Sequence, residues 1–227
     1  MVALACVSLV VGAAAGWQLA ISARAEHMLP ALGRAPEYHG LTDQLGRTVD
    51  STRFRGKVQV VTFLFPYCTT YCPLIAAHLI GLEQLLALAG LQDRVALVAF
   101  NVDPAGTGPA QMRAFLKEYG WNPHDTHWEY LTGAPQAIRR VVTQGYHVAY
   151  QKVSDSAAGA RGPAMTPQPE VINALAAETN VGYDIVHNDA VDIVDPQGRI
   201  REVYTQADVV SNGRMLGVIK ALLRPKS

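Results

Sequence analysis

The sequence is poor in cysteine and has no excess of charge of either sign. Its 227 residues contain three cysteines, and 19 Lys and Arg residues balance 19 Asp and Glu residues. Three cysteines exclude a small domain held together by several disulfides. There is no basic run, which argues against nucleic-acid binding, and no acidic tail. At this length we expect one domain with a substantial core, together with accessory segments.

Charge is also absent from the first part of the chain, where no charged side chain precedes Arg24. About 20 apolar residues suffice to cross a bilayer as a helix, so residues 1–25 are predicted to be a membrane anchor or a signal peptide. Ala23-Arg-Ala25 has the form of a signal-peptidase site, and the alternative is therefore a secreted or periplasmic protein cleaved near Ala25. The length of the apolar stretch favours an anchor in the cytoplasmic (inner) membrane, with the domain on the outer, periplasmic side. Cys6 lies in this segment and is not expected to meet the other two cysteines.

Those two cysteines lie four residues apart, between a predicted strand and a predicted helix. The segment reads Cys68-Thr-Thr-Tyr-Cys72-Pro73. Proline can open a helix because the N–H that it lacks would be unpaired there. The dipole and the free N–H groups of a helix start favour thiolate over thiol. Four-residue spacing brings both sulfurs to one side of a turn, where they can close a disulfide or bind a soft metal ion.

Strands and helices alternate along the rest of the chain. Lys57 to Phe65 is β-branched and aromatic and nearly uninterrupted, as in a strand buried on both faces, and Leu74 to Ala89 has a helical period that ends at Gly90. This alternation predicts βαβ units and a mainly parallel sheet covered by helices. The further predicted elements are two short strands within 40–49, strands at 94–102, 128–131 and 145–153, and helices at 109–119, 135–144 and 209–223.

The C-terminal part predicts an antiparallel β-hairpin. Asp184–Val194 and Arg199–Tyr204 flank Asp195-Pro-Gln-Gly198, which is a tight-turn signature. A mixed central sheet flanked by helices, with a cysteine pair where the first long strand meets its helix, indicates an α/β, thioredoxin-like fold. Residues 154–180 are small, polar and proline-rich, as in a surface insertion. The predicted division is a leader (1–25), a linker (26–39) and a thioredoxin-like domain (40–227) that contains the insertion (154–180).

In this order the motifs resemble the SCO/SenC proteins, which are membrane-anchored, thioredoxin-fold copper proteins of cytochrome c oxidase assembly. The resemblance runs from about Leu41 to the C-terminus. It rests on Cys-x-x-x-Cys-Pro, Val102-Asp-Pro104, Leu131-Thr-Gly133 and a histidine, His187, on the C-terminal hairpin. It implies that Cys68, Cys72 and His187 bind one copper ion, as Cu(I) and/or Cu(II). Thiolates select Cu(I), an added imidazole also permits Cu(II), and structural zinc sites prefer four protein ligands.

The chain departs from the family pattern at two places. Ala105-Gly-Thr-Gly108 stands where the family usually has charged residues, and Val186 stands where an aspartate commonly precedes the histidine. Loss of that carboxylate removes a charge next to the site, which can change copper affinity or the choice of partner. These departures indicate a divergent member with an altered target.

Two functions remain open at this point. The first is a copper metallochaperone, not an enzyme, that delivers copper to a cytochrome oxidase subunit or another copper-receiving protein. The second is an extracytoplasmic thiol–disulfide oxidoreductase, in which Cys68 and Cys72 form the redox pair and keep a target's cysteines reduced. A peroxidase is disfavoured, because no motif supplies the arginine and threonine that polarise a peroxide.

Other side chains are weaker candidates for the site. Asp103 either supports the metal site or caps the turn that follows it. His124 and His127 lie in one polar loop, and we expect surface histidines there rather than a second metal site. His78 is expected on a helix surface, and Met165, alone in a loop, is not expected to bind a metal.

Overall fold

The computed structural model describes residues 29–123, 127–154, 182–207 and 209–224. The predicted leader, nearly all of the predicted insertion, Cys6, His124 and Met165 lie outside the described residues.

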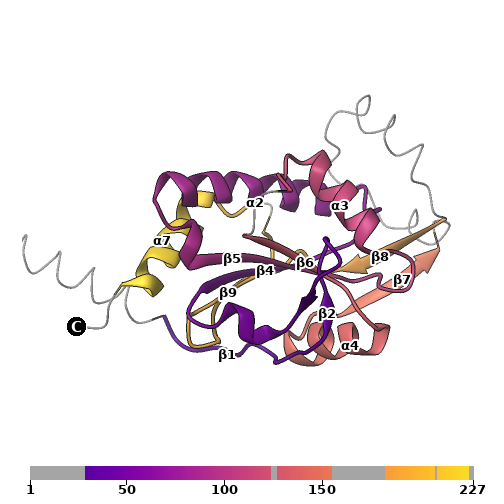
Figure 1. The fold of residues 1–227 in the computed structure, drawn as a ribbon, viewed down its shortest axis with the longest axis horizontal. Helices are drawn as coiled ribbons and strands as arrows, with labels where there is room; N and C mark the ends of the chain where they lie inside the picture. The colour runs from indigo at the N-terminus through magenta and orange to yellow at the C-terminus, as the bar shows by residue number, and fades with distance from the viewer. Residues whose placement is uncertain (1–28, 124–126, 155–181, 208, 225–227) are drawn as a thin grey trace, which may run out of the picture.

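A six-stranded mixed sheet forms the centre of the domain, with the strand order β1-β10-β9-β4-β5-β6 (Figure 1). Strands β4, β5 and β6 are parallel, and β9 runs antiparallel to β4. Every residue of β4 and β5 is buried, as expected for strands covered on both faces. The strands are β1 (Gly33–Arg34), β4 (Val58–Leu64), β5 (Val95–Asn101), β6 (Trp128–Leu131), β9 (Val191–Val194) and β10 (Arg199–Tyr204).

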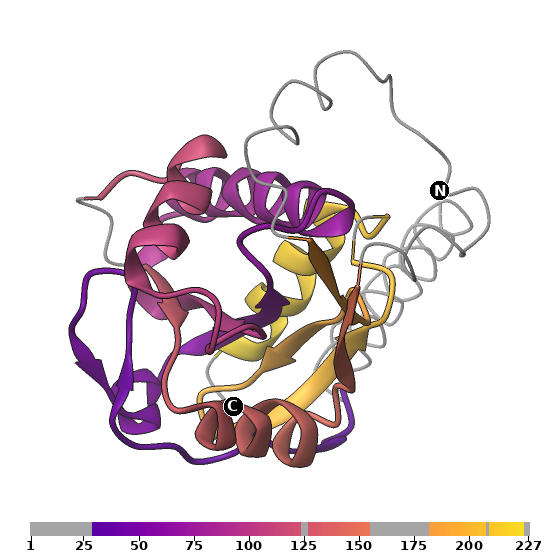
Figure 2. The same cartoon turned by 90° about the vertical axis from the view of Figure 1, so that its right-hand side faces the viewer.

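Helices cover the two faces of this sheet (Figures 1 and 2). On one face lie α2 (Tyr71–Leu88), α3 (Pro109–Glu118) and α7 (Asn212–Leu223), with α2 packed on α7 and β5. On the other lies α4 (Pro135–Arg139), which continues into a π-helical turn (Arg140–Gly145). Two 3₁₀ turns, Ser51–Phe54 and Gln92–Arg94, complete the helical structure of the described residues.

Helix α2 is, among the described helices, the one that is long and apolar enough to cross a membrane. Its buried side includes Ile75, Leu79 and Leu82, which belong to the hydrophobic core. The helix therefore has a place inside the domain that accounts for its apolar composition.

Two short ribbons lie beside the main sheet. One pairs β2 (Leu41–Thr42) with β3 (Thr48–Val49), and the other pairs β7 (Tyr150–Ser154) with β8 (Tyr183–His187). Central mixed sheet, flanking helices and C-terminal hairpin together confirm the predicted α/β, thioredoxin-like fold.

The element that carries His187 differs from the prediction. The strand predicted over 184–194 breaks between β8 and β9, so the β9–β10 hairpin does not contain the histidine. His187 instead ends β8, which pairs with β7. The break occurs because the chain leaves the ribbon there and joins the central sheet, where the Thr62 hydroxyl donates to the Ala190 carbonyl oxygen at 3.3 Å.

Other boundaries also differ from the prediction. The predicted linker (26–39) contains β1, which pairs with β10, and Tyr38, which is buried, so the domain begins before residue 40. Helix α2 begins at Tyr71, two residues before Pro73. The strand predicted over 145–153 begins only at Tyr150, because the π-helical turn extends to residue 145.

Candidate metal centre

Cys68 and Cys72 lie where the central strand β4 ends and α2 begins. Cys68 precedes the helix, and its backbone N–H donates to the Phe65 carbonyl oxygen at 3.0 Å, which closes a turn after the strand. Cys72 is the second residue of α2 and is fully buried, whereas Cys68 is 9% exposed. The predicted placement of both sulfurs at a helix start is therefore confirmed.

The β7–β8 ribbon brings His187 to this helix start. Its Nε2 atom lies 3.5 Å from the Sγ atom of Cys72, a residue 115 positions away in the sequence. Its Nδ1 atom lies 2.8 Å from the carbonyl oxygen of Asn188. A carbonyl can only accept, so Nδ1 carries the proton and the lone pair is on Nε2, facing the sulfur. Burial lowers the pKa of His187, which favours this neutral ring.

The two thiols differ in acidity. A hydrogen bond from the Cys72 thiol lowers the pKa of Cys68 to about 6, and this effect, with help from Thr70, outweighs burial. The Thr70 hydroxyl lies 3.4 Å from the Cys68 sulfur. Burial raises the pKa of Cys72 well above its usual value, and the neighbouring Cys68 raises it further. At neutral pH the pair therefore consists of a Cys68 thiolate and a Cys72 thiol.

Tyr183, at the start of β8, fastens the ribbon to the body of the domain. Its hydroxyl donates to Asp103 Oδ2 at 2.6 Å. Its ring stacks on Phe65, at the end of β4, with a centroid separation of 5.7 Å. The Lys152 ammonium lies 3.2 Å from the centroid of the same ring. Phe65 is three residues before Cys68, so one tyrosine links the strand of His187 to the segment that carries the sulfurs.

Gly106, next to the Tyr183–Asp103 hydrogen bond, has no room for a side chain. A Cβ atom at Gly106 would collide with Asp103 Oδ2 and with the Tyr183 hydroxyl. Gly106 belongs to the Ala105–Gly108 segment that departs from the family pattern. The short, small-residue loop thus leaves space for the hydrogen bond that holds β8.

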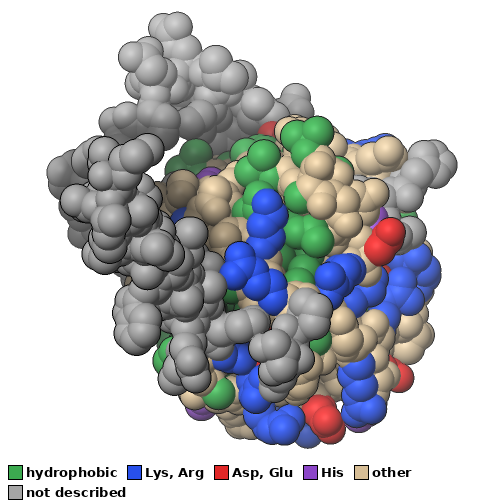
Figure 3. Space-filling model, turned by 90° about the vertical axis from the view of Figure 1, so that its left-hand side faces the viewer, with side chains coloured by type: hydrophobic (Ala, Val, Ile, Leu, Met, Phe, Trp, Pro, Cys, Tyr) green, Lys and Arg blue, Asp and Glu red, His purple; other side chains and the backbone are tan. Residues whose placement is uncertain are grey.

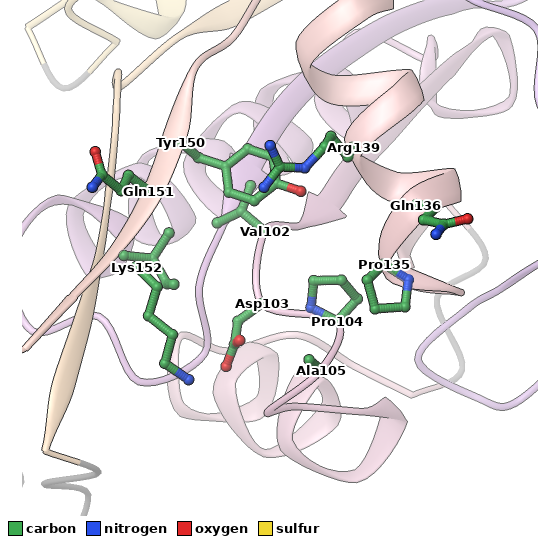
Figure 4. A pocket seen from close by; sticks show the side chains of 11 residues that line it. Val102, Asp103, Pro104, Ala105, Pro135, Gln136, Arg139, Tyr150, Gln151 and Lys152 are labelled. Carbon is green, nitrogen blue, oxygen red and sulfur yellow. The ribbon is translucent and has the colours of Figure 1, made fainter.

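A cavity of about 460 Å³ lies behind the ribbon (Figure 4). Residues of β7, of β8 and of the loop after β5 line it, together with α4. Arg139, beside Tyr150, and Lys152 lie on different sides of it, and Asp103 lies next to Pro104 (Figure 4). The ribbon therefore borders the cavity, and the Tyr183–Asp103 hydrogen bond ties it to the loop after β5.

The structure brings the predicted ligands together only in part. Cys72 contacts both Cys68 and His187. Within the described ranges, no three His, Cys, Asp or Glu side chains are already arranged as a metal-binding group, so the sulfurs and the imidazole would have to close around an ion. Asp103 is buried and engages Tyr183 rather than a sulfur.

The two other candidate histidines among the described residues lie apart from this cluster and are partly rather than fully exposed. His78 is half-buried on α2, and its carbonyl oxygen accepts from the Asn212 side chain at 3.0 Å. His127 is half-buried before β6, where its carbonyl oxygen accepts from the Leu97 N–H.

Sequence reasoning missed Thr70, Tyr183 and Asn188. Asn188 acts through a backbone carbonyl, which every residue has, and so leaves no signal in the sequence. Thr70 lies within the quoted cysteine motif and Tyr183 directly precedes the predicted hairpin, but only the packing shows what their hydroxyl groups contact.

Comparison with known proteins connects this geometry to a family. The model of the family described as SCO1/SenC matches residues 34–224. A curated relative, the SCO1 protein homolog of Bacillus subtilis (strain 168), is 30% identical over 95 residues. That alignment spans 42% of this chain and 47% of the relative, so the chain is matched to about half the length of this relative.

Solved structures share the fold at lower identity. A SCO1/SenC family lipoprotein from Bacillus anthracis str. Ames has a TM-score of 0.64 and 20% identity, covering 85% of this chain and 96% of that one. ScoI of Bradyrhizobium japonicum, described with copper bound, has a TM-score of 0.58 and 22% identity, covering 84% and 99%. ScoI of Arabidopsis thaliana, also with copper bound, has a TM-score of 0.60 and 20% identity, covering 84% and 98%. Because the family model spans nearly the whole described domain, this chain belongs to the SCO1/SenC family.

Proposed function

We propose that the chain carries one copper ion, bound through Cys68, Cys72 and His187, and delivers it to the copper centre of a respiratory oxidase during assembly. Family membership supports this proposal, as do the copper-bound ScoI structures from two organisms. A further fold relative, BsSco, is described as a member of the Sco family of cytochrome c oxidase assembly proteins.

The observation that carries the proposal is the 3.5 Å approach of Cys72 Sγ to His187 Nε2. Metal–sulfur and metal–nitrogen bonds of about 2.3 and 2.1 Å at a tetrahedral angle place the two donor atoms roughly 3.6 Å apart. The donor atoms are thus already at ligand spacing, and the lone pair of Nε2 faces the gap. Two sulfurs and one imidazole suit Cu(I) and also accommodate Cu(II).

The unequal thiols define how an ion would be taken up. The Cys68 thiolate needs no deprotonation at neutral pH, whereas Cys72 must release its proton as its sulfur binds. Three protein ligands leave a coordination position open. An incoming sulfur of a recipient can therefore add to the ion before a donor of this chain leaves, and the ion is never released into solution.

The proposed recipient is a cytochrome oxidase subunit or another copper-receiving protein on the outer side of the cytoplasmic membrane. The uncharged leader would hold the domain there, either as an anchor or, in the alternative, only until cleavage near Ala25. No nucleic-acid partner is proposed.

The decisive experiment measures copper retained per chain after loading of the reduced protein and removal of excess metal. We expect one tightly held copper in the wild type, lost or greatly weakened in Cys68→Ala, Cys72→Ala and His187→Ala. His39→Ala is the matched control, because this side chain is 71% exposed and lies near Asp50, away from the site. Full copper affinity in His187→Ala would sink the three-ligand proposal.

A thiol–disulfide oxidoreductase is the second candidate, favoured by the pairing of one acidic and one weakly acidic thiol. The Cys68 thiolate would attack a target disulfide, and Cys72 would then release the reduced target, leaving a Cys68–Cys72 disulfide. The fold relative BsSco is described as having a disulfide switch. The same variants separate the two functions, because disulfide reduction needs both cysteines but tolerates His187→Ala.

A further inference from the structure

The two ends of the central sheet carry different parts of the domain. The candidate metal centre lies at the carboxyl end of β4. At the other end lie the starts of β4 and β5 and the turn between β9 and β10, since the Gly56 N–H donates to the Pro196 carbonyl oxygen at 3.1 Å. The end of α7 lies there too, because the Arg94 side chain donates to the Leu223 carbonyl oxygen at 2.9 Å. Strand β1 pairs with the first residues of β10 at the same end.

Basic residues gather at this end. Lys57 and Arg94 immediately precede β4 and β5, and Arg34 lies on the edge strand β1. Figure 3 shows Lys and Arg side chains around a group of hydrophobic side chains, with few acidic ones among them. We call this surface the basal face and define it by Leu32, Arg34, Arg55, Lys57, Leu88, Arg94, Lys220 and Arg224.

Acidic residues do not cancel this charge. Asp195 is buried and already paired with Arg199 and Arg201. Glu37 reaches Arg55 only at 3.8 Å, with both side chains largely exposed, and Asp93 is the other exposed acid near this end. Exposed apolar side chains accompany the cations, with Leu32 58% and Leu88 85% exposed.

The polypeptide enters the domain at the same face. The Leu32 N–H donates to the Ile200 carbonyl oxygen at 2.8 Å, and the Arg201 side chain donates to the carbonyl oxygens of Leu29 and Pro30. The chain is therefore fastened to the β10 edge from its first described residue. The uncharged stretch of the leader ends before Arg24, and the chain from Arg24 to Leu29 spans at most about 18 Å when fully extended.

We propose that the basal face docks on the surface of an anionic lipid bilayer and that the candidate metal centre consequently points away from the membrane. Clustered Lys and Arg side chains next to a membrane segment are attracted by anionic headgroups. Exposed leucines among such cations can enter the headgroup region, as the apolar face of an interfacial helix does. The short connection to the leader keeps this face, rather than the opposite one, next to the bilayer.

The test uses the full chain in lipid nanodiscs and compares hydrogen–deuterium exchange in phosphatidylglycerol-containing discs with exchange in phosphatidylcholine discs. We expect β1, residues 55–57 and the last turn of α7 to exchange more slowly in the anionic discs only. The protection should disappear in 1 M salt, where the Debye length is about 3 Å. It should also disappear in the triple variant Arg34→Glu, Arg55→Glu, Lys220→Glu, whose residues are exposed.

A matched triple variant, Lys117→Glu, Arg139→Glu, Arg140→Glu, makes the same charge change on exposed residues of α3, α4 and the π-helical turn. It should keep the protection of the basal face. Equal exchange in the two lipids, or equal loss of protection in the two triple variants, would overturn the docking proposal. The docking proposal rests on the membrane anchor of the proposed function, but its readout does not involve copper, so a failure of docking and a failure of copper binding are distinguishable.

Discussion

At the scale of single residues, the cysteine pair is unequal because of where each sulfur lies. Cys68 is in the loop before α2 and receives a hydrogen bond from Cys72, while Cys72 is fully buried in the first turn of the helix. Two cysteines only four positions apart thus have pKa shifts of opposite sign: the pKa of Cys68 is lowered and that of Cys72 is raised. This asymmetry can be measured in the reduced protein before any metal is added.

We expect the alkylation of Cys68 by iodoacetamide to rise with a midpoint near pH 6 in the metal-free, reduced protein. An ordinary cysteine would show a midpoint near pH 8.5. Mass spectrometry of modified peptides across a pH series measures the rate for each cysteine separately. In Cys72→Ala the midpoint of Cys68 should move upward, because the hydrogen bond from Cys72 is the largest cause of its shift. A wild-type midpoint near 8.5 would contradict this assignment.

Gly106 gives a second prediction at this scale. In Gly106→Ala the new methyl group would displace the Asp103 carboxylate and the Tyr183 hydroxyl, so we expect weaker copper retention and a loss of roughly 1–3 kcal/mol of stability. Equilibrium unfolding and a copper competition assay measure both. Gly217→Ala in α7 is the matched control, because nothing lies within 4 Å of its Cβ position, and it should leave the site unchanged. Unchanged copper affinity in Gly106→Ala would show that the ribbon is held by other contacts.

At the scale of elements, most strands and helices were predictable because their signals are local. The run that became β4 is mostly apolar and β-branched, and the period of α2 repeats over several turns. Placing His187 was harder, because the break after β8 depends on pairing with β7 across a long separation in sequence. The family pattern identified the histidine, but only the fold showed which strand carries it.

In the candidate site, too, local features were predictable from the sequence, whereas contacts that depend on the packing were not. The placement of both cysteines at a helix start depends on local features and was predicted correctly, although the helix begins at Tyr71, two residues before Pro73. The orientation of the His187 ring depends on the Asn188 carbonyl, and the attachment of its strand depends on Tyr183 and Asp103. The Asn188 carbonyl is a backbone group that leaves no signal in the sequence, and the Tyr183–Asp103 contact joins residues 80 positions apart, so no periodicity or spacing could have revealed either.

At the scale of the whole molecule, two aspartates of one hairpin affect stability in opposite ways. Asp192 is 2% exposed at the centre of the sheet, its Oδ1 atom has no hydrogen-bond partner, and burial raises its pKa to about 7. Asp195 is also buried, which works against ionisation. Hydrogen bonds from the Arg199 backbone and from the Arg201 and Arg199 side chains nevertheless hold its pKa below 3.8.

We expect the wild type to lose stability as the pH rises from about 4 to about 7, since in this range the folded state binds a proton at Asp192 that the unfolded chain has released. Asp192→Asn should abolish this loss and exceed the wild type by a few kcal/mol above pH 7. Denaturant titrations over a pH series measure the effect. Asp195→Asn serves as a comparison of opposite sign, because its stabilising ionisation is present above pH 3.8 and is lost as the pH falls. Parallel pH profiles for the wild type and Asp192→Asn would refute the role of Asp192.

The three donor atoms of the candidate metal centre lie on three differently supported pieces of chain: a loop, a helix and a two-stranded ribbon outside the main sheet. The three donor groups are therefore held in place by different sets of contacts. The helix is fixed by the core, whereas the ribbon borders a cavity and is attached through Tyr183, which bonds Asp103, and through Tyr150, which contacts Arg139. For a bound copper ion, substitutions at the attachment of the ribbon would therefore alter retention without touching either cysteine.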